Sequence, residues 1–299
     1  MCQPLRSLLF LTFFYLPATQ AMAALQVFAC EPEWAALTRE MGGEGVDVFS
    51  ATHAGQDPHH IQARPSLIAR MRSADLVVCS GAGLESGWLP MLQRRARNPR
   101  VMSGESGLFE ASRQVTLLDK PESLDRSEGD IHGDGNPHIQ LDPRRLLQVA
   151  GALSLRLQQL DPADAGYYQA RLDQFQQRWT RAMQVWQEAA QPLRGVRVIV
   201  FHREWVYLLD WLGMTRVGSL EPKPGVPPGI DHLASLKKLP ADLVILSPLN
   251  DPKPAQWLQE QTGITLVTLP QTVTATEDSG DLFKLFDSLV QRLTSGLQR

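Results

Sequence analysis

Several features that would quickly assign a function are missing from this chain of 299 residues. It has no run of lysine and arginine and no alternation of basic with aromatic residues, and its formal net charge is −3 at pH 7. Binding to a nucleic-acid backbone needs a basic face, so we expect no nucleic-acid partner. Cys-x-x-Cys spacing and internal repeats are also missing, which argues against a cysteine metal site and a repeat architecture.

The signature motifs of several enzyme classes are absent as well. The sequence contains no His-Glu-x-x-His, no Gly-x-Ser-x-Gly and no Gly-x-x-x-x-Gly-Lys. Those motifs would have indicated a metalloprotease, a serine hydrolase and a phosphate-binding loop respectively. We therefore expect a protein that is not an enzyme.

One long apolar run stands out, and it lies at the N-terminus. Arg6 supplies a positive charge, Leu8–Leu16 are almost entirely apolar, and Ala21–Ala23 form a small-x-small cleavage site. This pattern predicts a secretory signal peptide over residues 1–23, and the run is too short to span a membrane. Cys2 precedes the apolar run, so a lipid-attached cysteine is not expected. The mature protein should be periplasmic, with no further membrane-spanning segment.

Two cysteines, Cys30 and Cys79, remain after the predicted cleavage. Export places them in an oxidising compartment, where disulfides persist. Each stands at the end of an expected strand, and neighbouring parallel strands can bring two such residues within bonding reach. A disulfide and a pair of small buried thiols are both compatible with the sequence.

The N-terminal third alternates short apolar runs with helical patterns. Strands are expected at Leu25–Ala29, Val46–Ser50 and Asp75–Ser80, and helices at Glu33–Met41 and Pro65–Ser73. This β-α-β-α-β rhythm predicts a parallel sheet covered by helices.

The middle of the chain is helical. Asp142-Pro143 and Asp161-Pro162 each combine a capping carboxylate with a proline in the first turn, which is typical of a helix start. The second helix should run to about residue 190 and be roughly 40 Å long. A helix of this length could be one member of a bundle, but the strands on either side favour a strut between two lobes.

The α/β rhythm returns after the long helix. Strands are expected at Val196–Phe201, Leu243–Ser247 and Thr265–Leu269, and helices at Val206–Leu212 and Asp281–Leu297. The predicted fold class is therefore α/β, with two parallel-sheet lobes joined by a long rigid backbone helix.

The expected domain organisation follows from these elements. Residues 24–160 form an N-terminal α/β lobe, residues 161–191 the connecting helix, and residues 192–299 a C-terminal α/β lobe. Ligands of open α/β sheets bind beyond the carboxyl ends of the strands, so we expect the binding site in the cleft between the lobes.

Three of the seven histidines lie where such a cleft would collect them. His59 and His138 each follow a proline, which stiffens the chain, and His202 directly follows an expected strand. Neutral imidazole is a good ligand for zinc, nickel, copper and iron. Any one of these histidines alone would be an ordinary packing or surface residue, but together they suggest a three-histidine metal site.

The motifs around these histidines resemble a known family. They are Asp57-Pro58-His59 with Arg64-Pro65-Ser66, Ala74–Val78 with Gly81–Glu85, Asn136-Pro137-His138 with Leu141-Asp142-Pro143, and Val200-Phe201-His202 leading into Trp205–Trp211. In these motifs and their order the chain is similar to the zinc-binding solute-binding proteins of bacterial ABC importers. That ZnuA-like cluster also includes manganese-binding members. The resemblance covers nearly all of the mature chain.

The resemblance implies a function and a set of ligands. The ligands would be His59, His138 and His202, and they would hold one divalent ion, with Zn²⁺ favoured over Mn²⁺. This ion is the cargo for delivery to an ABC transporter membrane permease. We expect a monomer, and a periplasmic metallochaperone is a possible second partner. The alternatives are a manganese-binding member of the family and, less favoured, a zinc-dependent hydrolase, since a three-histidine zinc with an open position is also a hydrolytic centre.

The fourth ligand is not evident. Manganese-binding relatives supply a carboxylate after the last strand, but that position falls near Gln271 in this chain. Asp278 is the main candidate, because it lies a few residues further on, beside Glu277. Glu204, close to His202, is another, and water is the remaining possibility.

A segment before the second expected ligand also differs from that of zinc-specific relatives, many of which carry a long histidine-rich loop there. Here residues 119–135 are short and acidic, with His132 as their one histidine. This segment could gather cations weakly, dock a metallochaperone, or be an ordinary solvated loop.

Several further residues and one loop bear on the site. Glu85 and Trp88 could orient a metal ligand or cap the following helix. The proline-rich loop at residues 221–228 could border the cleft, contact the permease, or be a plain linker. His53 and His232 are expected to be surface or packing residues.

Overall fold

The computed structural model describes residues 24–121, 132–274 and 280–298. The expected signal peptide therefore lies outside the described residues, as do Glu277 and Asp278. Within the described part of the chain, no helix is both long enough and apolar enough to cross a membrane.

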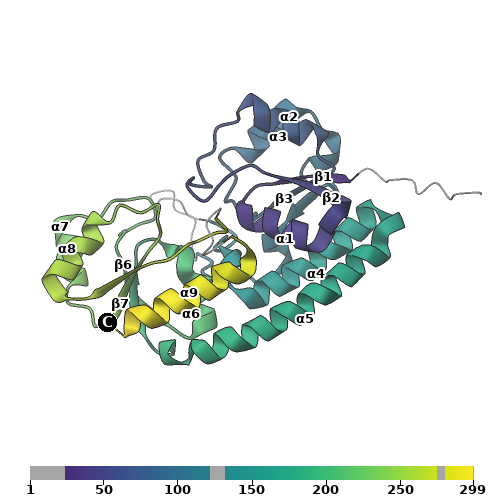
Figure 1. Ribbon diagram of the computed structural model, residues 1–299. Coiled ribbons are helices and arrows are strands. Elements are labelled where there is room, and N and C mark those ends of the chain that lie inside the picture. The colour runs from purple at the N-terminus through teal and green to yellow at the C-terminus, as the bar shows by residue number, and fades with distance from the viewer. Residues whose placement is uncertain (1–23, 122–131, 275–279, 299) are drawn as a thin grey trace, which may run out of the picture.

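The first lobe is built on a parallel sheet with the strand order β2-β1-β3-β4 (Figure 1). Its strands are β1 Leu25–Ala29, β2 Val46–Ser50, β3 Leu76–Cys79 and β4 Leu108–Glu110. Its helices are α1 Pro32–Gly42, α2 Pro65–Ser73 and α3 Leu89–Ala96. Alternate residues of the central strands point to opposite faces. Val27 and Val78 therefore join a core with α1, while Phe28 and Val77 pack with α2 and α3.

The second lobe repeats this plan with the strand order β6-β5-β7-β8. Its strands are β5 Arg197–Val200, β6 Thr215–Ser219, β7 Leu243–Leu246 and β8 Thr265–Thr268. Its helices are α6 Val206–Leu212, α7 Ile230–Leu236, α8 Lys253–Thr262 and α9 Leu282–Leu297. Val198 and Ile245 face the core that includes α6 and α9, whereas Ile199 and Val244 pack against α7 and α8.

Two long helices, α4 Pro143–Leu160 and α5 Ala165–Ala189, connect the lobes. Asp142 caps α4 by accepting a hydrogen bond from the backbone N–H of Arg144. The predicted start of the second helix was wrong by a few residues, because residues 162–164 form a short 3₁₀ turn. The carboxylate of Asp161 instead accepts the hydroxyl hydrogen of Tyr168.

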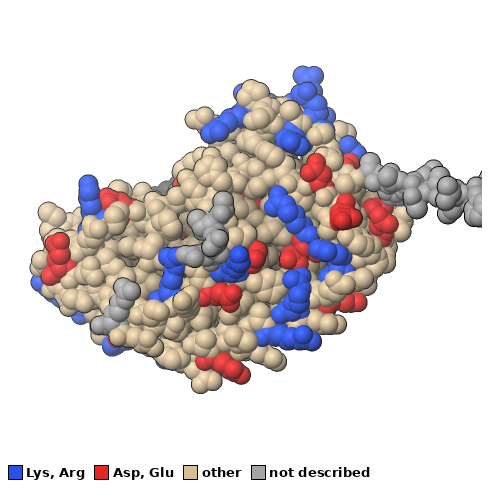
Figure 2. Space-filling model, viewed as in Figure 1, with Lys and Arg blue, Asp and Glu red and all other residues tan. Residues whose placement is uncertain are grey.

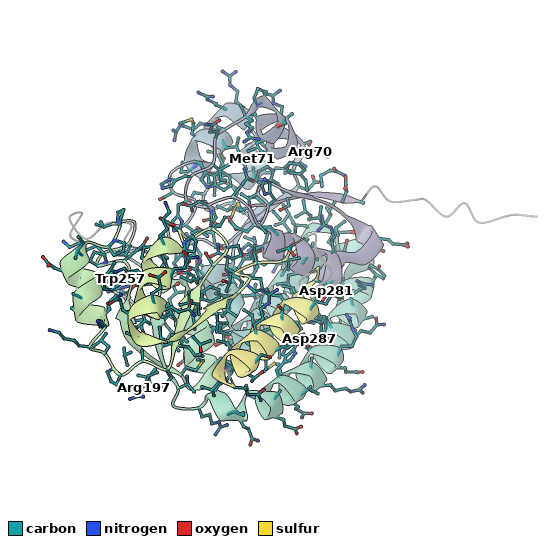
Figure 3. The ribbon with its side chains drawn as sticks, turned by 60° about the vertical axis from the view of Figure 1, so that its left-hand side comes forward. Arg70, Met71, Arg197, Trp257, Asp281 and Asp287 are labelled. Carbon is teal, nitrogen blue, oxygen red and sulfur yellow. A yellow bond between two sulfur atoms is a disulfide. The ribbon has the colours of Figure 1, made fainter. Side chains whose placement is uncertain are left out.

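Helix α5 runs beneath both lobes and packs against α1, α4 and α9 (Figure 1). Trp186 of α5 stacks near Phe286 of α9 and donates its Nε1–H to Asp287 Oδ1 at 2.6 Å. Asp287 is labelled on α9 in Figure 3. One buried apolar cluster therefore extends from β1 through α4 and α5 to β5 and α9. This shared core confirms the predicted fold class of two parallel-sheet lobes joined by a long helix.

Charged side chains of both signs are interspersed on the face shown in Figure 2, with basic residues gathered over α2 and α3. Arg70 and Arg72 lie in the last turn of α2, and Arg94 and Arg95 in the last turn of α3. Cations at these positions complement the negative end of each helix dipole.

Candidate metal centre

The three expected histidines come from separate elements and meet between the lobes. His59 lies in the loop between β2 and α2, His138 precedes α4, and His202 follows β5. The ring centroids of His59 and His138 are 5.9 Å apart, those of His59 and His202 are 6.4 Å apart, and those of His138 and His202 are 6.3 Å apart. The fold thus brings together residues that are up to 143 positions apart in the sequence.

The ring of His59 is oriented by its own loop. Its Nδ1 lies 2.7 Å from Asp57 Oδ1, and its backbone N–H donates to the same oxygen at 3.0 Å. The hydrogen bond from His59 lowers the pKa of Asp57 to about 2, so this carboxylate is ionised at neutral pH. It therefore accepts a hydrogen bond from the protonated Nδ1 of His59. Trp88 Nε1–H donates to the carbonyl of Pro58 at 2.9 Å, which fixes the backbone beside the histidine.

His202 is oriented in the same way by a residue from the proline-rich loop. Its Nδ1 lies 2.7 Å from Glu221 Oε2, which also accepts the backbone N–H of Gly225 at 3.2 Å. Burial alone would lower the pKa of His202, but the hydrogen bond to Glu221 and the nearby charge of Glu204 raise it overall. The interpretation that this loop borders the cleft therefore gains support, since Glu221 lines the same cavity as the three histidines.

His138 is the most buried of the three, with 6% of its surface exposed. Its backbone N–H donates to Asn136 Oδ1 at 3.0 Å, and Tyr207 holds the same loop by donating to the Asn136 carbonyl at 2.6 Å. Burial, reinforced by the charges of His59 and His202, lowers the pKa of His138 well below 6.5. A neutral ring with a buried Nε2 that has no hydrogen-bond partner among the described residues suits metal coordination.

The Nε2 atoms are therefore the nitrogens of this cluster that can donate a lone pair to a metal ion. When Nδ1–H is donated to a carboxylate, as in His59 and His202, the neutral ring carries its lone pair on Nε2. A tetrahedral zinc about 2.0–2.1 Å from each nitrogen would place imidazole centroids roughly 5 Å apart. The observed separations of 5.9–6.4 Å mean that the rings must move inward to share one ion.

A cavity of about 340 Å³ leads to the three histidines. Glu204 and Gln271 also line it. Glu204 is 2% exposed, its Oε2 has no hydrogen-bond partner among the described residues, and burial raises its pKa. The oxygen donors that line this cavity thus include the buried carboxyl of Glu204 and the amide of Gln271. The expected fourth ligand Asp278 lies outside the described residues.

A fourth histidine lies at this site, and the sequence did not single it out as a ligand. The Nε2 atoms of His132 and His59 are 3.2 Å apart, and their rings stack at a centroid distance of 5.3 Å. The centroid of His132 is also 6.5 Å from that of His138. Its position as the one histidine of an acidic segment just before the second expected ligand was the available signal.

The remaining histidines have other surroundings. His60, next to His59, is exposed. His53 is also exposed and accepts a hydrogen bond from the backbone N–H of Gly55, whereas His232 Nε2 lies 2.8 Å from the carbonyl of Ser219. These contacts agree with the surface and packing roles expected for His53 and His232.

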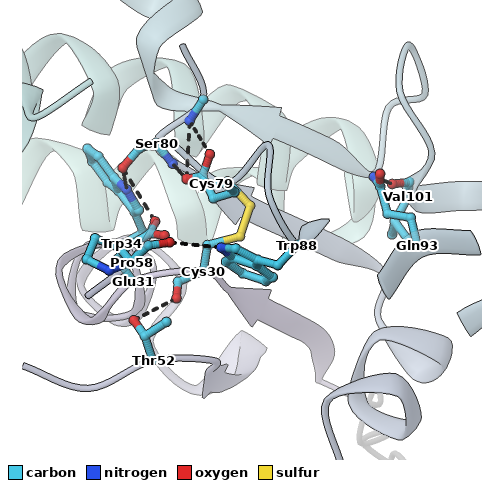
Figure 4. The surroundings of a disulfide bond; sticks show 12 residues. Cys30, Glu31, Trp34, Thr52, Pro58, Cys79, Ser80, Trp88, Gln93 and Val101 are labelled. Atoms are coloured by element: carbon cyan, nitrogen blue, oxygen red, sulfur yellow. Dashed lines mark hydrogen bonds between the residues drawn. A yellow bond between two sulfur atoms is a disulfide. The ribbon is translucent and has the colours of Figure 1, made fainter. Parts of the chain in front are cut away.

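Cys30 and Cys79 form a disulfide between the end of β1 and the end of β3 (Figure 4). Next to it, Glu85 accepts hydrogen bonds from the backbone N–H groups of Ser80 and Gly81, at 2.7 and 3.1 Å. Glu85 therefore secures the turn after β3, while Trp88 secures the loop of His59. Of the two residues, only Trp88 contacts the backbone next to an expected ligand.

Comparison with known proteins bears directly on this arrangement. The family model described as "Zinc-uptake complex component A periplasmic" (ZnuA) matches residues 27–296, almost the whole described chain. The chain belongs to this family. It is 26% identical over 200 residues to the high-affinity zinc uptake system protein ZnuA of Yersinia pestis, an alignment that covers 61% of each chain.

The chain is also similar to two further proteins. The chain is 23% identical over 151 residues to the manganese ABC transporter substrate-binding lipoprotein PsaA of Streptococcus mitis, covering 50% of this chain and 47% of the relative. A crystal structure of ZnuA superposes with a TM-score of 0.77 at 22% identity, covering 91% of this chain and 99% of that one. The sequence alignments thus span about half to three fifths of these relatives, whereas the ZnuA-type fold is shared over nearly the full length.

Proposed function

We propose that this ZnuA-family protein binds one divalent metal ion through His59, His138 and His202 and delivers it to an ABC importer permease. The observation that carries the proposal is the convergence of three imidazoles, two of which are clamped at Nδ1 by Asp57 and Glu221. Such carboxylate–histidine pairs fix the tautomer and increase the basicity of the metal-binding nitrogen.

Zinc is the favoured cargo, and manganese is the alternative. Three imidazoles suit tetrahedral zinc, whereas manganese prefers more oxygen ligands. Gln271 supplies an amide where manganese-binding relatives are expected to place a carboxylate. Relatives named for zinc and for manganese both match this chain, so the preference for zinc depends on the donor set.

Capture and release fit the site better than catalysis does. The ligands come from loops of two lobes, and the rings are spread wider than a bound ion allows. An ion held in this way can be surrendered when the loops separate, whereas a hydrolytic zinc centre needs a rigid site with an open coordination position. The protein would act as a periplasmic monomer exported by the signal peptide at residues 1–23, and a metallochaperone could load it.

The proposal is tested by measuring zinc content and competitive zinc titration on the mature protein. The comparison sets wild type beside the triple variant His59→Ala, His138→Ala, His202→Ala, with His53→Ala, His232→Ala as the matched control. We expect one tightly held zinc in wild type and in the control, and none in a triple variant that still folds. Stoichiometric zinc retained by the triple variant would place the ligands elsewhere.

A further inference from the structure

The cluster of imidazoles at the cleft has four members, which is the number of ligands in a closed zinc site. The distances among His59, His132, His138 and His202 include five ring pairs between 5.3 and 6.5 Å. These are five of the six pairs that four rings make, and closed zinc sites hold four ligands in a tetrahedron.

The closest pair already has the spacing of shared ligands. Nitrogens bound tetrahedrally to one zinc at about 2.0–2.1 Å are separated by roughly 3.3–3.4 Å. His59 Nε2 and His132 Nε2 are 3.2 Å apart. Without metal this contact is a hydrogen bond in which His132 Nε2–H donates, because His59 keeps its proton on Nδ1 to bind Asp57.

The surrounding space fits the same arrangement. A second cavity, of about 60 Å³, is lined by His132, His138 and His202. His138 and His202 also line the larger cavity that contains His59. His138 and His202 therefore border both cavities, with His59 lining the larger one and His132 the smaller one.

We propose that His132 is the fourth ligand of the metal, so that the site is an all-imidazole centre. This inference rests on the proposed function and sharpens it. Its competitor for the fourth position is the buried carboxyl of Glu204. Nitrogen at all four positions favours zinc, copper, nickel and cobalt and disfavours manganese, which prefers oxygen donors. His132 would then determine specificity, in place of the expected Asp278.

The test compares His132→Ala with His60→Ala, which removes an exposed histidine next to the site, and with Glu204→Gln. Zinc affinity is measured by competition with a chelator, and the bound imidazoles are counted by X-ray absorption on the zinc-loaded proteins. We expect four imidazoles in wild type and in both comparison variants, and three in His132→Ala. The affinity of His132→Ala should fall by more than the roughly 10- to 100-fold typical of losing an orienting partner.

The outcomes separate this inference from the proposed function. If wild type binds one zinc, while His132→Ala keeps the same affinity and the same imidazole count, His132 is not a ligand although the three-histidine site stands. If Glu204→Gln changes the zinc spectrum and His132→Ala does not, the fourth ligand is the carboxyl. If wild type binds no zinc at all, the proposed function itself fails.

Discussion

At the scale of residues, the proposed metal site is built from carboxylates as well as histidines. Asp57 and Glu221 each accept an Nδ1–H, and in doing so they leave Nε2 of His59 and of His202 as the nitrogen with the lone pair. Asp57 is two residues from its histidine, so that contact is local. Glu221 is 19 residues from His202, and its contact depends on how the proline-rich loop folds back.

Removing the Glu221 carboxylate should weaken metal binding without removing a ligand. In Glu221→Ala the ring of His202 loses its orienting acceptor, so we expect the zinc dissociation constant to rise about 10- to 100-fold. Glu260→Ala, on the exposed side of α8 in the same lobe, is the matched control and should leave it unchanged. Isothermal titration with a competing chelator measures the difference. Equal affinities in the two variants would show that the contact does not tune the site.

The difference between local contacts and contacts distant in the sequence explains how far the sequence could predict the site. His59, His138 and His202 were recognisable because each stands in a motif of its own. His132 and Glu221 were not assigned as partners, because their contacts join segments whose approach no local pattern encodes: 73 residues separate His132 from His59. Asp278, the predicted fourth ligand, lies outside the described residues, so that assignment stays a prediction.

At the scale of elements, the strongest sequence patterns gave accurate boundaries. Leu25–Ala29 and Val46–Ser50 are strands as predicted, since each is a short apolar or alternating run between helices. The strands that were missed, β4 and β6, are edge strands: β4 has three residues, and β6 has no buried residue. An edge strand needs little apolar sequence, because the adjoining strand supplies most of its pairing.

The disulfide joins two elements that lead into the loops around the site. It links Cys30 at the end of β1 to Cys79 at the end of β3, which are 49 residues apart, and so lowers the conformational entropy of the unfolded chain. We expect Cys30→Ala, Cys79→Ala to lower the free energy of unfolding by roughly 2–4 kcal/mol. Urea denaturation measures this change. Wild type with its disulfide reduced serves as the control, and it should unfold at the same urea concentration as the variant. An unchanged midpoint would mean that the bond adds no stability.

At the scale of the whole molecule, the two lobes are not independent bodies. The central core is shared through α4, α5 and α9, so metal loading should tighten loops more than it rotates lobes. The lobes also meet at the cleft, where Thr272, after β8, donates its hydroxyl to the buried carboxyl of Glu33 at the start of α1. The division into residues 24–160, 161–191 and 192–299 remains a prediction, since one core crosses these boundaries.

The burial of the Glu33 carboxyl should make stability depend on pH, whereas the hydrogen bond from Thr272 lowers the pKa of that carboxyl and so opposes the effect. Burial raises the pKa of Glu33 from 4.5 to about 7. Between these values the unfolded chain releases the proton first, so stability is highest at low pH and falls as the pH rises towards 7. Glu33→Gln removes this titration, and its stability relative to wild type should increase by up to roughly 3 kcal/mol between pH 4.5 and 7. Thermal or urea unfolding of both proteins across that pH range measures the difference. If the free energies of unfolding of wild type and Glu33→Gln changed in parallel with pH, the prediction would be contradicted.

The three convergent imidazoles predict that one metal ion binds where the two lobes meet. Anomalous diffraction at the zinc absorption edge, on crystals of the zinc-loaded protein, tests it most directly. We predict one strong peak about 2.0–2.1 Å from the Nε2 atoms of His59, His138 and His202. A peak held instead by the acidic residues of segment 119–135, with these three imidazoles unligated, would contradict the account.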